Sequence, residues 1–205
     1  VNLAPADLKK EGPSFDLPIA LAMIAASRTK PFDADDCCVV GELGLDGAVR
    51  PVKGVLSIAL EAKRRGRTRV LVPAVNAPEA AVIDGIQVIP VRSLREAWDF
   101  LDGEVRIPPY QLDRQAFFEA HRRYEADFDE VRGQHFVKRA LEVAAAGGHN
   151  LVLIGPPGTG KSMLARRLAT ILPPLTLSEA LETTQIHSVV GQLPSGQALI
   201  TRRPF

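Results

Sequence analysis

The segment most suited to chemistry runs from Gly155 to Ser162 and reads GPPGTGKS. It matches the pattern G-x-x-x-x-G-K-[ST], a loop that holds the phosphates of a nucleotide. Glycines at Gly155, Gly158 and Gly160 let the backbone adopt unusual dihedral angles and approach phosphate oxygens closely. The loop amides and the amino terminus of the helix that follows can then bind an anion.

Two side chains complete the predicted site. Lys161 should reach the β- and γ-phosphates of ATP as a point charge, and Ser162 should supply a hydroxyl to Mg²⁺. We therefore predict ATP and Mg²⁺ as cofactors, with Ser162 as the metal ligand. The predicted nucleotide-binding residues are Gly155, Pro156, Pro157, Gly158, Thr159, Gly160, Lys161, Ser162 and Met163.

Hydrolysis of ATP needs a further group, an acidic residue at the end of a second apolar strand that holds Mg²⁺ and orients water. After Ser162 the only acidic residues are Glu179 and Glu182, both in SEALETTQ, which reads as a surface helix. The acids from Asp127 to Glu130 follow no apolar strand either. We therefore predict that this chain binds ATP and contains no catalytic residue for its hydrolysis.

The elements around the loop are those that must position it. Residues 151–154, LVLI, predict a short buried strand of the parallel kind. A helix is predicted over residues 161–171, where two prolines stop it. Two earlier helices are predicted over about 114–124 and 134–146, and Gly147-Gly148 should end the second.

The first half of the chain alternates strand and helix patterns. Ser14 reads as the cap of an apolar helix that should be buried on all sides. Asp46-Gly47 between two β-like runs predicts a hairpin. The strand patterns RVLVP and IQVIPV are each followed by a helix pattern, which favours an α/β fold with parallel pairing. The proline-bearing stretch 104–113 reads as an extended linker between domains at 1–103 and 114–205.

Longer stretches resemble a known family. Residues 131–176, VRGQHFVKRALEVAAAGGHNLVLIGPPGTGKSMLARRLATILPPLT, are similar to the opening of the AAA+ module in the magnesium-chelatase-like family known as YifB or ComM. Within them VRGQ, at 131–134, resembles the AAA+ turn that contacts adenine, and 186–196 with 202–205 resembles the family's continuation. The resemblance implies an acidic Mg²⁺ strand, sensor residues and an arginine finger further on. With the start at VNLAP, which reads as a strand, we expect a piece cut inside both domains.

The first half resembles a second group of proteins. EGPSFDLPIALAMIAAS and GELGLDGAVRPVKGVLSIALEAKRRG, at 11–27 and 41–66, are similar to the proteolytic domain of Lon and the related domain of RadA. The resemblance implies a Lon-protease-like α/β domain followed by the N-terminal part of a P-loop AAA+ domain. It places Ser14 at the Lon nucleophile but Leu56 at the Lys base, and Lys53 lies three residues away. Because Leu cannot accept a proton, we predict that the domain is not proteolytic.

The family resemblance implies that the full-length protein is a homo-oligomeric, hexameric ring ATPase that acts on DNA, with branch migration in natural transformation as the family's role. Three alternatives stay open: an ATPase subunit of magnesium chelatase, an ATP-dependent Ser protease of the Lon type, and a fragment that is simply an inert binding module. A chelatase assay with partner subunits would separate the first, and labelling of Ser14 by a fluorophosphonate probe would separate the second.

Composition limits the remaining classes. The chain has 205 residues, with 25 Lys and Arg against 24 Asp and Glu, so overall charge does not indicate a nucleic-acid partner. The run 63–69 holds five basic residues, which either contact DNA phosphates or occupy a solvated helix end. No apolar run reaches the roughly 18 residues of a membrane helix. The adjacent Cys37 and Cys38 match no disulfide framework or metal motif, and they fit a cytoplasmic protein.

Overall fold

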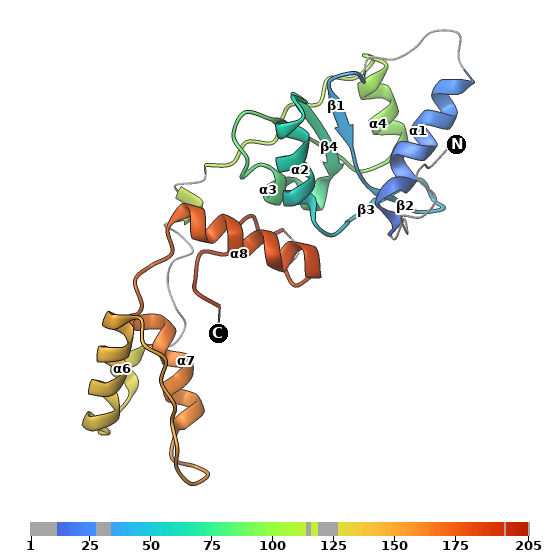
Figure 1. Ribbon diagram of the computed structural model, residues 1–205. Coiled ribbons are helices and arrows are strands. Elements are labelled where there is room, and N and C mark those ends of the chain that lie inside the picture. The colour runs from blue at the N-terminus through green and yellow to red at the C-terminus, as the bar shows by residue number, and fades with distance from the viewer. Residues whose placement is uncertain (1–11, 28–33, 114–115, 119–126, 195, 205) are drawn as a thin grey trace, which may run out of the picture. The chain divides into compact units, whose positions relative to one another are not determined.

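The computed structural model describes residues 12–27, 34–113, 116–118, 127–194 and 196–204 (Figure 1). The chain divides into two compact units. Unit 1 comprises Val1–Arg114 and Leu181–Leu199, and unit 2 comprises Gln115–Ala180 and Ile200–Phe205. Segment 181–199, which the sequence pattern assigns to the second domain, is thus grouped with unit 1, and the domain division stays a prediction. The predicted strand at VNLAP and most of the predicted helix 114–124 lie outside the described residues.

Unit 1 is built on a three-stranded parallel sheet. Strands β1 (Cys37–Val39), β4 (Arg69–Pro73) and β5 (Gln87–Val91) lie in the order β1-β4-β5, and both pairings are parallel. Parallel neighbours need crossover connections, and helices α2 (Val55–Arg64) and α3 (Ala77–Ala80) lie within them. The predicted α/β class and its parallel pairing are confirmed, whereas the Lon-like character of the unit stays a prediction.

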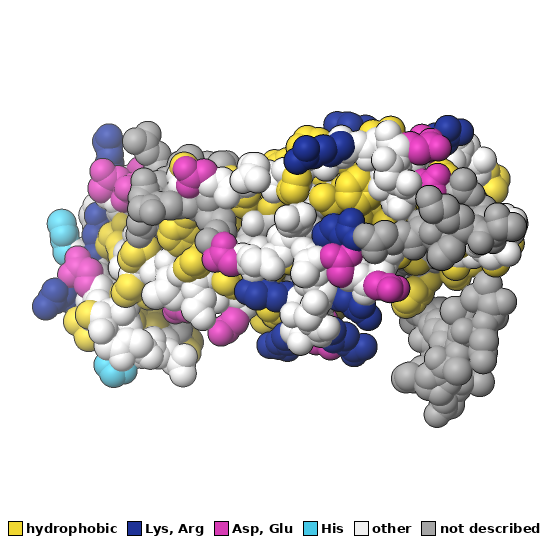
Figure 2. All heavy atoms as spheres, turned by 90° about the horizontal axis from the view of Figure 1, so that it is seen from above, with side chains coloured by type: hydrophobic (Ala, Val, Ile, Leu, Met, Phe, Trp, Pro, Cys, Tyr) yellow, Lys and Arg dark blue, Asp and Glu magenta, His cyan; other side chains and the backbone are white. Residues whose placement is uncertain are grey.

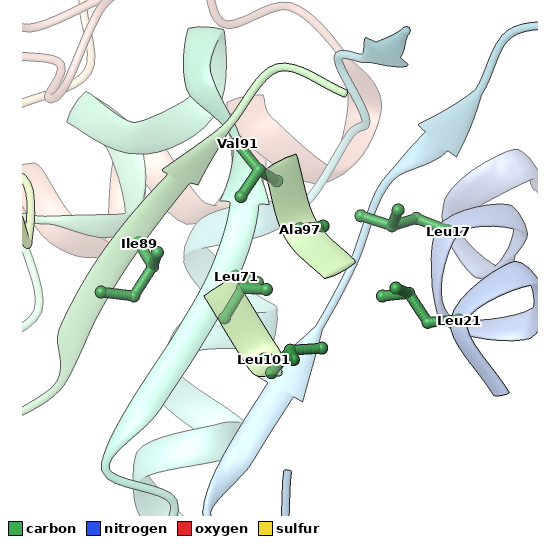
Figure 3. Packing of buried hydrophobic residues seen from close by; sticks show 7 residues of the cluster. All are labelled: Leu17, Leu21, Leu71, Ile89, Val91, Ala97 and Leu101. Atoms are coloured by element: carbon green, nitrogen blue, oxygen red, sulfur yellow. The ribbon is translucent and has the colours of Figure 1, made fainter. Parts of the chain in front are cut away.

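Two helices cover one face of this sheet. Helices α1 (Asp16–Ala26) and α4 (Leu94–Leu101) pack their apolar side chains against β4 and β5 (Figure 3). Figure 1 shows α2 and α3 on the other side, so both faces are covered, as a parallel sheet requires. The cluster of buried residues consists of Leu17, Leu21, Leu71, Ile89, Val91, Ala97 and Leu101.

The predicted hairpin is confirmed. Strands β2 (Glu42–Leu43) and β3 (Val49–Arg50) pair antiparallel across the Asp46-Gly47 turn. Gly47 has a φ of 79°, a conformation that strains any residue with a Cβ atom. The Asp-Gly pair therefore predicts the turn for a stereochemical reason that the structure bears out.

The start of α1 differs from the prediction. Ser14 does not cap the helix, because it lies inside a short 3-10 helix, η1 (Pro13–Phe15), and Phe15 takes the N-cap position without a side-chain hydrogen bond. This extra turn displaces the Ser14 hydroxyl from the first helical amides. The helix is also not buried on all sides. Leu17 is buried but Met23 is 62% exposed, since only one face of a covering helix meets the sheet.

Helix α2 receives its cap from another part of the chain. Its N-cap residue is Gly54, with a φ of 76° and no side chain to offer. Glu79 of α3 supplies the acceptor: its Oε1 accepts the Leu56 N–H at 2.9 Å, and its Oε2 accepts Asn76 Nδ2 at 3.2 Å. Asn76 also bonds the N–H and the C=O of Val52, at 3.1 and 3.0 Å. These two side chains hold the loop that leads into α2.

Replacing Glu79 with Ala is expected to lower the free energy of unfolding by about 1–3 kcal/mol, because the buried Leu56 N–H loses its acceptor. Glu79 is 5% exposed, so water has little access to replace the bond. Urea denaturation of the chain measures the loss. Glu61→Ala on the exposed face of α2 is the control, with an expected change under about 0.5 kcal/mol. Equal losses in both variants would contradict the capping role.

Residues 104–113 form no helix or strand and are grouped with unit 1, so their role as a linker stays a prediction. The Tyr110 N–H donates to the Val88 carbonyl at 2.8 Å, and Ile107 packs against the buried cluster of that unit. The stretch is therefore partly fixed to the sheet rather than fully solvated.

Unit 2 contains η3 (Phe128–Glu130), α6 (His135–Gly147) and α7 (Lys161–Ile171). Helix α6 ends at Gly148, whose φ of 63° gives the left-handed C-cap expected of a glycine there. Both helices fall where the sequence predicts them. Helix α8 (Leu177–Val190) follows, and its residues from Leu181 onward are grouped with unit 1.

The strand predicted at 151–154 is not found in the structure. These residues form no strand, and no described segment pairs with them. Leu151 and Leu153 are half-buried against the apolar cluster of unit 2, whereas Val152 and Ile154 are 81% and 93% exposed. The alternation is that of a strand with one covered face. Because strand structure requires a hydrogen-bonded neighbour, the prediction of a buried strand is wrong for the described chain.

Helix α8 has one exposed face and one buried face. Its small and polar residues Ala180, Thr184 and Ser188, spaced by four, are buried, while Ile186 and Val189 are 65% and 57% exposed. Ser188 donates a hydrogen bond to the Glu79 carboxylate, a partner within the same unit. None of the helices in the described part of the chain has the length and apolarity to cross a membrane.

Candidate nucleotide-binding loop

Two glycines in the left-handed region shape the loop before α7. Gly158 has a φ of 82° and Gly160 a φ of 81°. A Cβ atom on Gly158 would meet nothing within 4 Å, so backbone conformation rather than space requires glycine there. Gly160 is the N-cap of α7 and makes no side-chain cap. The first amides of α7 are therefore available to an anion.

The Lys161 ammonium is held by the loop itself. Its Nζ donates to the carbonyl oxygens of Gly155 at 2.8 Å and Pro156 at 2.7 Å, and it lies 3.4 Å from Thr159 Oγ1. Thr159 Oγ1 in turn donates to the Pro156 carbonyl at 3.0 Å. The predicted lysine and the predicted loop residues are thus brought together. A fixed positive charge beside a helix amino terminus favours phosphate binding.

Ser162 and Met163 occupy the first turn of α7, and both are exposed, as are 155–159 of the loop. A solvated loop of this kind is open to a ligand in solution. No group of three or more His, Cys, Asp or Glu within the described ranges could hold a metal ion. A Mg²⁺ ion at Ser162 would take its other oxygen ligands from nucleotide phosphates and from water, since this ion usually keeps several waters.

One side chain outside the loop contacts it directly. Gln134 Nε2 donates to the Thr159 carbonyl at 3.1 Å. Gln134 has a φ of 52°, and Gly133 before it has a φ of 67°, so the turn 131–134 is left-handed at two successive positions. The turn that resembles the adenine-contacting turn is thereby tied to the phosphate loop. The Gly-Gln pair before a helix signals the turn, but no sequence pattern predicts the contact.

A second interaction joins α7 to the segment before α6. Arg167 Nε donates to the Asp127 carbonyl at 3.0 Å, and its guanidinium pairs with the Glu130 carboxylate. The guanidinium holds the pKa of Glu130 below its usual value. These residues, which the sequence pattern gives no role, hold η3 beside α7. Nothing in the sequence distinguishes Arg167 from its neighbour Arg166 in this respect.

Apolar packing fixes these elements from beneath. The buried cluster of unit 2 joins Phe128 and Val131 to Leu141 of α6 and Leu164 of α7. Leu151 and Leu153, just before the loop, pack against the same cluster. Both ends of the loop are therefore anchored, one by α7 and the other by alternate leucines.

The three residues considered for proteolysis, Leu56, Ser14 and Lys53, have different surroundings. Leu56 is 2% exposed, and its amide is bonded to Glu79. Ser14 lies in η1, where its carbonyl accepts the Gly41 N–H at 3.0 Å. Lys53 is exposed in the loop before α2. No hydrogen bond within the described residues joins Ser14 to a lysine, and the position expected for the base carries a buried apolar side chain.

The surroundings of the two cysteines are those of packed side chains. Cys37 and Cys38 lie half-buried on β1. Burial raises the pKa of the Cys37 thiol to about 12, so this group stays protonated at neutral pH. A protonated thiol is a poor nucleophile and a poor metal ligand.

Comparisons with known proteins give the relatives of this chain. The family model "Magnesium chelatase, subunit ChlI" matches residues 127–205, and the model "Subunit ChlI of Mg-chelatase" matches residues 1–76. The chain is 44% identical to YifB of Escherichia coli K12 over 207 residues, which cover 100% of this chain and 40% of YifB. It is 40% identical to the competence protein ComM of Haemophilus influenzae over 197 residues, which cover 93% of this chain and 38% of ComM.

A shorter match connects the chain to DNA repair protein RadA of Escherichia coli, with 38% identity over 89 residues, or 43% of this chain and 19% of RadA. The chain spans about two fifths of the length of YifB and ComM. Two ChlI family models and two relatives that match nearly all of the chain agree with the resemblance carried by residues 131–176. The chain belongs to the YifB/ComM-like, magnesium-chelatase-like family.

Proposed function

We propose that this chain binds ATP with Mg²⁺ at the loop 155–162. The observation that carries the proposal is the placement of Lys161 over the loop carbonyls at an α7 amino terminus that has no side-chain cap. The magnesium-chelatase-like family to which the chain belongs supports the same ligand.

The residues present fit the nucleotide. The donors here are backbone amides, an ammonium and a hydroxyl, which match phosphate oxygens and a phosphate-bound cation. Gly160, the N-cap of α7, has a φ of 81°, a left-handed conformation that a residue with a Cβ atom rarely adopts. In this proposal Lys161 and the amides of 158–162 hold the phosphates, and Ser162 contacts Mg²⁺. Gln134 positions the loop through Thr159.

For the full-length protein we propose a ring ATPase that acts on DNA. Two relatives support this by name, the competence protein ComM and the DNA repair protein RadA. Two of the described acids are held in ion pairs, Glu130 with Arg167 and Glu179 with Arg203. The proposal therefore assigns hydrolysis to the full-length protein, with a carboxylate outside the 205 residues.

The test uses the full-length protein with ATP and Mg²⁺. We expect binding to branched DNA and an ATPase rate that rises when DNA is added. Absence of both would refute the DNA-directed function. An ATPase subunit of magnesium chelatase is the second candidate, favoured by the names of the two family models. Metal insertion into a porphyrin with partner subunits, and no response to DNA, would establish that candidate instead.

Proteolysis by Ser14 gives a further prediction. A fluorophosphonate probe is expected to leave Ser14 unlabelled, because Leu56 cannot accept the hydroxyl proton and no described lysine is bonded to Ser14. Ser14→Ala is expected to leave ATP binding and stability unchanged within about 0.5 kcal/mol. A purified serine hydrolase labelled in parallel controls for the probe. Labelling of this chain that disappears in Ser14→Ala would revive the protease hypothesis.

A further inference from the structure

The end of α2 and the turn into β4 carry a dense positive charge. Five of the seven residues from Lys63 to Arg69 are basic, and we name Lys63, Arg64, Arg65, Arg67 and Arg69 the basic segment. All but Arg69 are exposed. Gly66, with a φ of 75°, turns the chain between the helix and the strand. On the face drawn in Figure 2, Lys and Arg side chains lie in several groups, some of them beside Asp and Glu side chains.

Cations at a helix end can stabilise it by bonding its last carbonyls. Here backbone amides already do so. The carbonyls of Glu61, Ala62 and Lys63 accept the N–H groups of Arg65, Arg67 and Gly66, at 3.0, 3.0 and 2.9 Å. The side chains of the basic segment are therefore not needed to satisfy the carboxyl end of α2.

Acidic neighbours neutralise only part of the charge. Glu61 pairs with Arg65 at 2.8 Å, and Asp36 pairs with Arg69. The Arg67 guanidinium donates to the backbone carbonyl of Asp35 and not to the Asp35 carboxylate. This bond fixes the guanidinium but does not neutralise its charge. Among the residues that the structure describes, ion pairs hold Arg65 and Arg69, and the remaining three cations of the basic segment form none.

We propose that the basic segment binds the phosphate backbone of DNA. This inference rests on the proposed function of the full-length protein on DNA and assigns that partner to a surface of unit 1. Arginine guanidinium groups suit phosphate oxygens geometrically, and such contacts are independent of base sequence. An acidic protein segment is the less favoured partner. Protein interfaces use apolar or aromatic anchors, and residues 63–69 hold only basic side chains, Gly66 and Thr68.

The test compares two triple variants of the 205-residue chain. Lys63→Ala/Arg64→Ala/Arg67→Ala removes three charges and leaves Arg65 and Arg69 on their carboxylate partners. Arg50→Ala/Arg92→Ala/Arg95→Ala removes the same charge from the same unit, at side chains that are 58%, 80% and 80% exposed. Fluorescence anisotropy with a labelled branched duplex, at several salt concentrations, gives the affinity and its salt dependence. An ATP titration checks each variant at the loop of unit 2.

We expect the first variant to bind DNA about tenfold or more weakly at about 0.1 M salt. Its salt slope should be lower by about 2.7, or about 0.9 for each phosphate that the variant no longer neutralises. The second variant should change the slope by less than about 1. ATP binding should be unchanged in both.

Equal weakening in the two variants, or none in the first, would overturn the inference while leaving the proposed function intact. Absence of DNA binding by the unaltered chain would also overturn it, and the full-length assay decides separately whether the function on DNA fails. A polyglutamate peptide tests the alternative partner. If the unaltered chain binds the peptide, and the first variant binds the peptide more weakly but DNA as tightly as the unaltered chain does, the segment is assigned to a protein partner instead.

Discussion

Replacing Lys161 with Ala is expected to weaken ATP binding by about 10- to 150-fold. The substitution removes a charged hydrogen-bond donor from the phosphates, an interaction worth about 1.5–3 kcal/mol. The structure places this ammonium on the Gly155 and Pro156 carbonyls at the mouth of the loop. Because those carbonyls are exposed, water can replace the lysine in the variant, and the fold should be unaffected.

The matched control is Arg166→Ala, an exposed cation on the same helix that removes the same charge. Isothermal titration with ATP, with and without Mg²⁺, measures both variants against the unaltered chain. We expect Arg166→Ala to change the affinity by less than about threefold. Equal affinity in Lys161→Ala and the unaltered chain would refute nucleotide binding at this loop.

Leu71→Ala is expected to lower the free energy of unfolding of unit 1 by about 2–5 kcal/mol. Leu71 is fully buried on the central strand β4, in the cluster that joins the sheet to α1 and α4 (Figure 3). Truncation leaves a cavity that this close-packed region cannot fill. Leu45→Ala, at the exposed tip of the hairpin, is the matched control and should change stability by less than about 0.5 kcal/mol.

The same variant tests the proposed two-domain organisation. If the two blocks unfold separately, Leu71→Ala should shift one thermal transition while Leu141→Ala, in the cluster of unit 2, shifts the other. Differential scanning calorimetry resolves the transitions, and an ATP titration of the Leu71→Ala chain shows whether the loop still binds. A single transition that both variants lower by similar amounts would contradict separate domains.

Local patterns predicted the elements whose cause lies within a few residues. The Asp46-Gly47 turn follows from the left-handed backbone that glycine permits, and β4 follows from a short run of buried apolar residues. The predicted bounds of α7 match the structure because Pro173-Pro174 cannot continue a helix. The strand predicted at 151–154 is the counterexample. Its apolar run is real, but strand structure depends on a neighbour that no apolar run can specify.

By itself the sequence determined the phosphate-loop pattern at 155–162, the helix that follows it and the absence of a lysine at position 56. Only the tertiary structure decided which side chains hold these elements in place. Gln134 bonds a residue 25 positions away, Arg167 bonds one 40 positions away, and Glu79 caps a helix 23 positions before it. Periodicity and turn chemistry report dihedral preferences of neighbouring residues. Contacts over such separations arise from packing, which brings together side chains whose types alone do not name their partners.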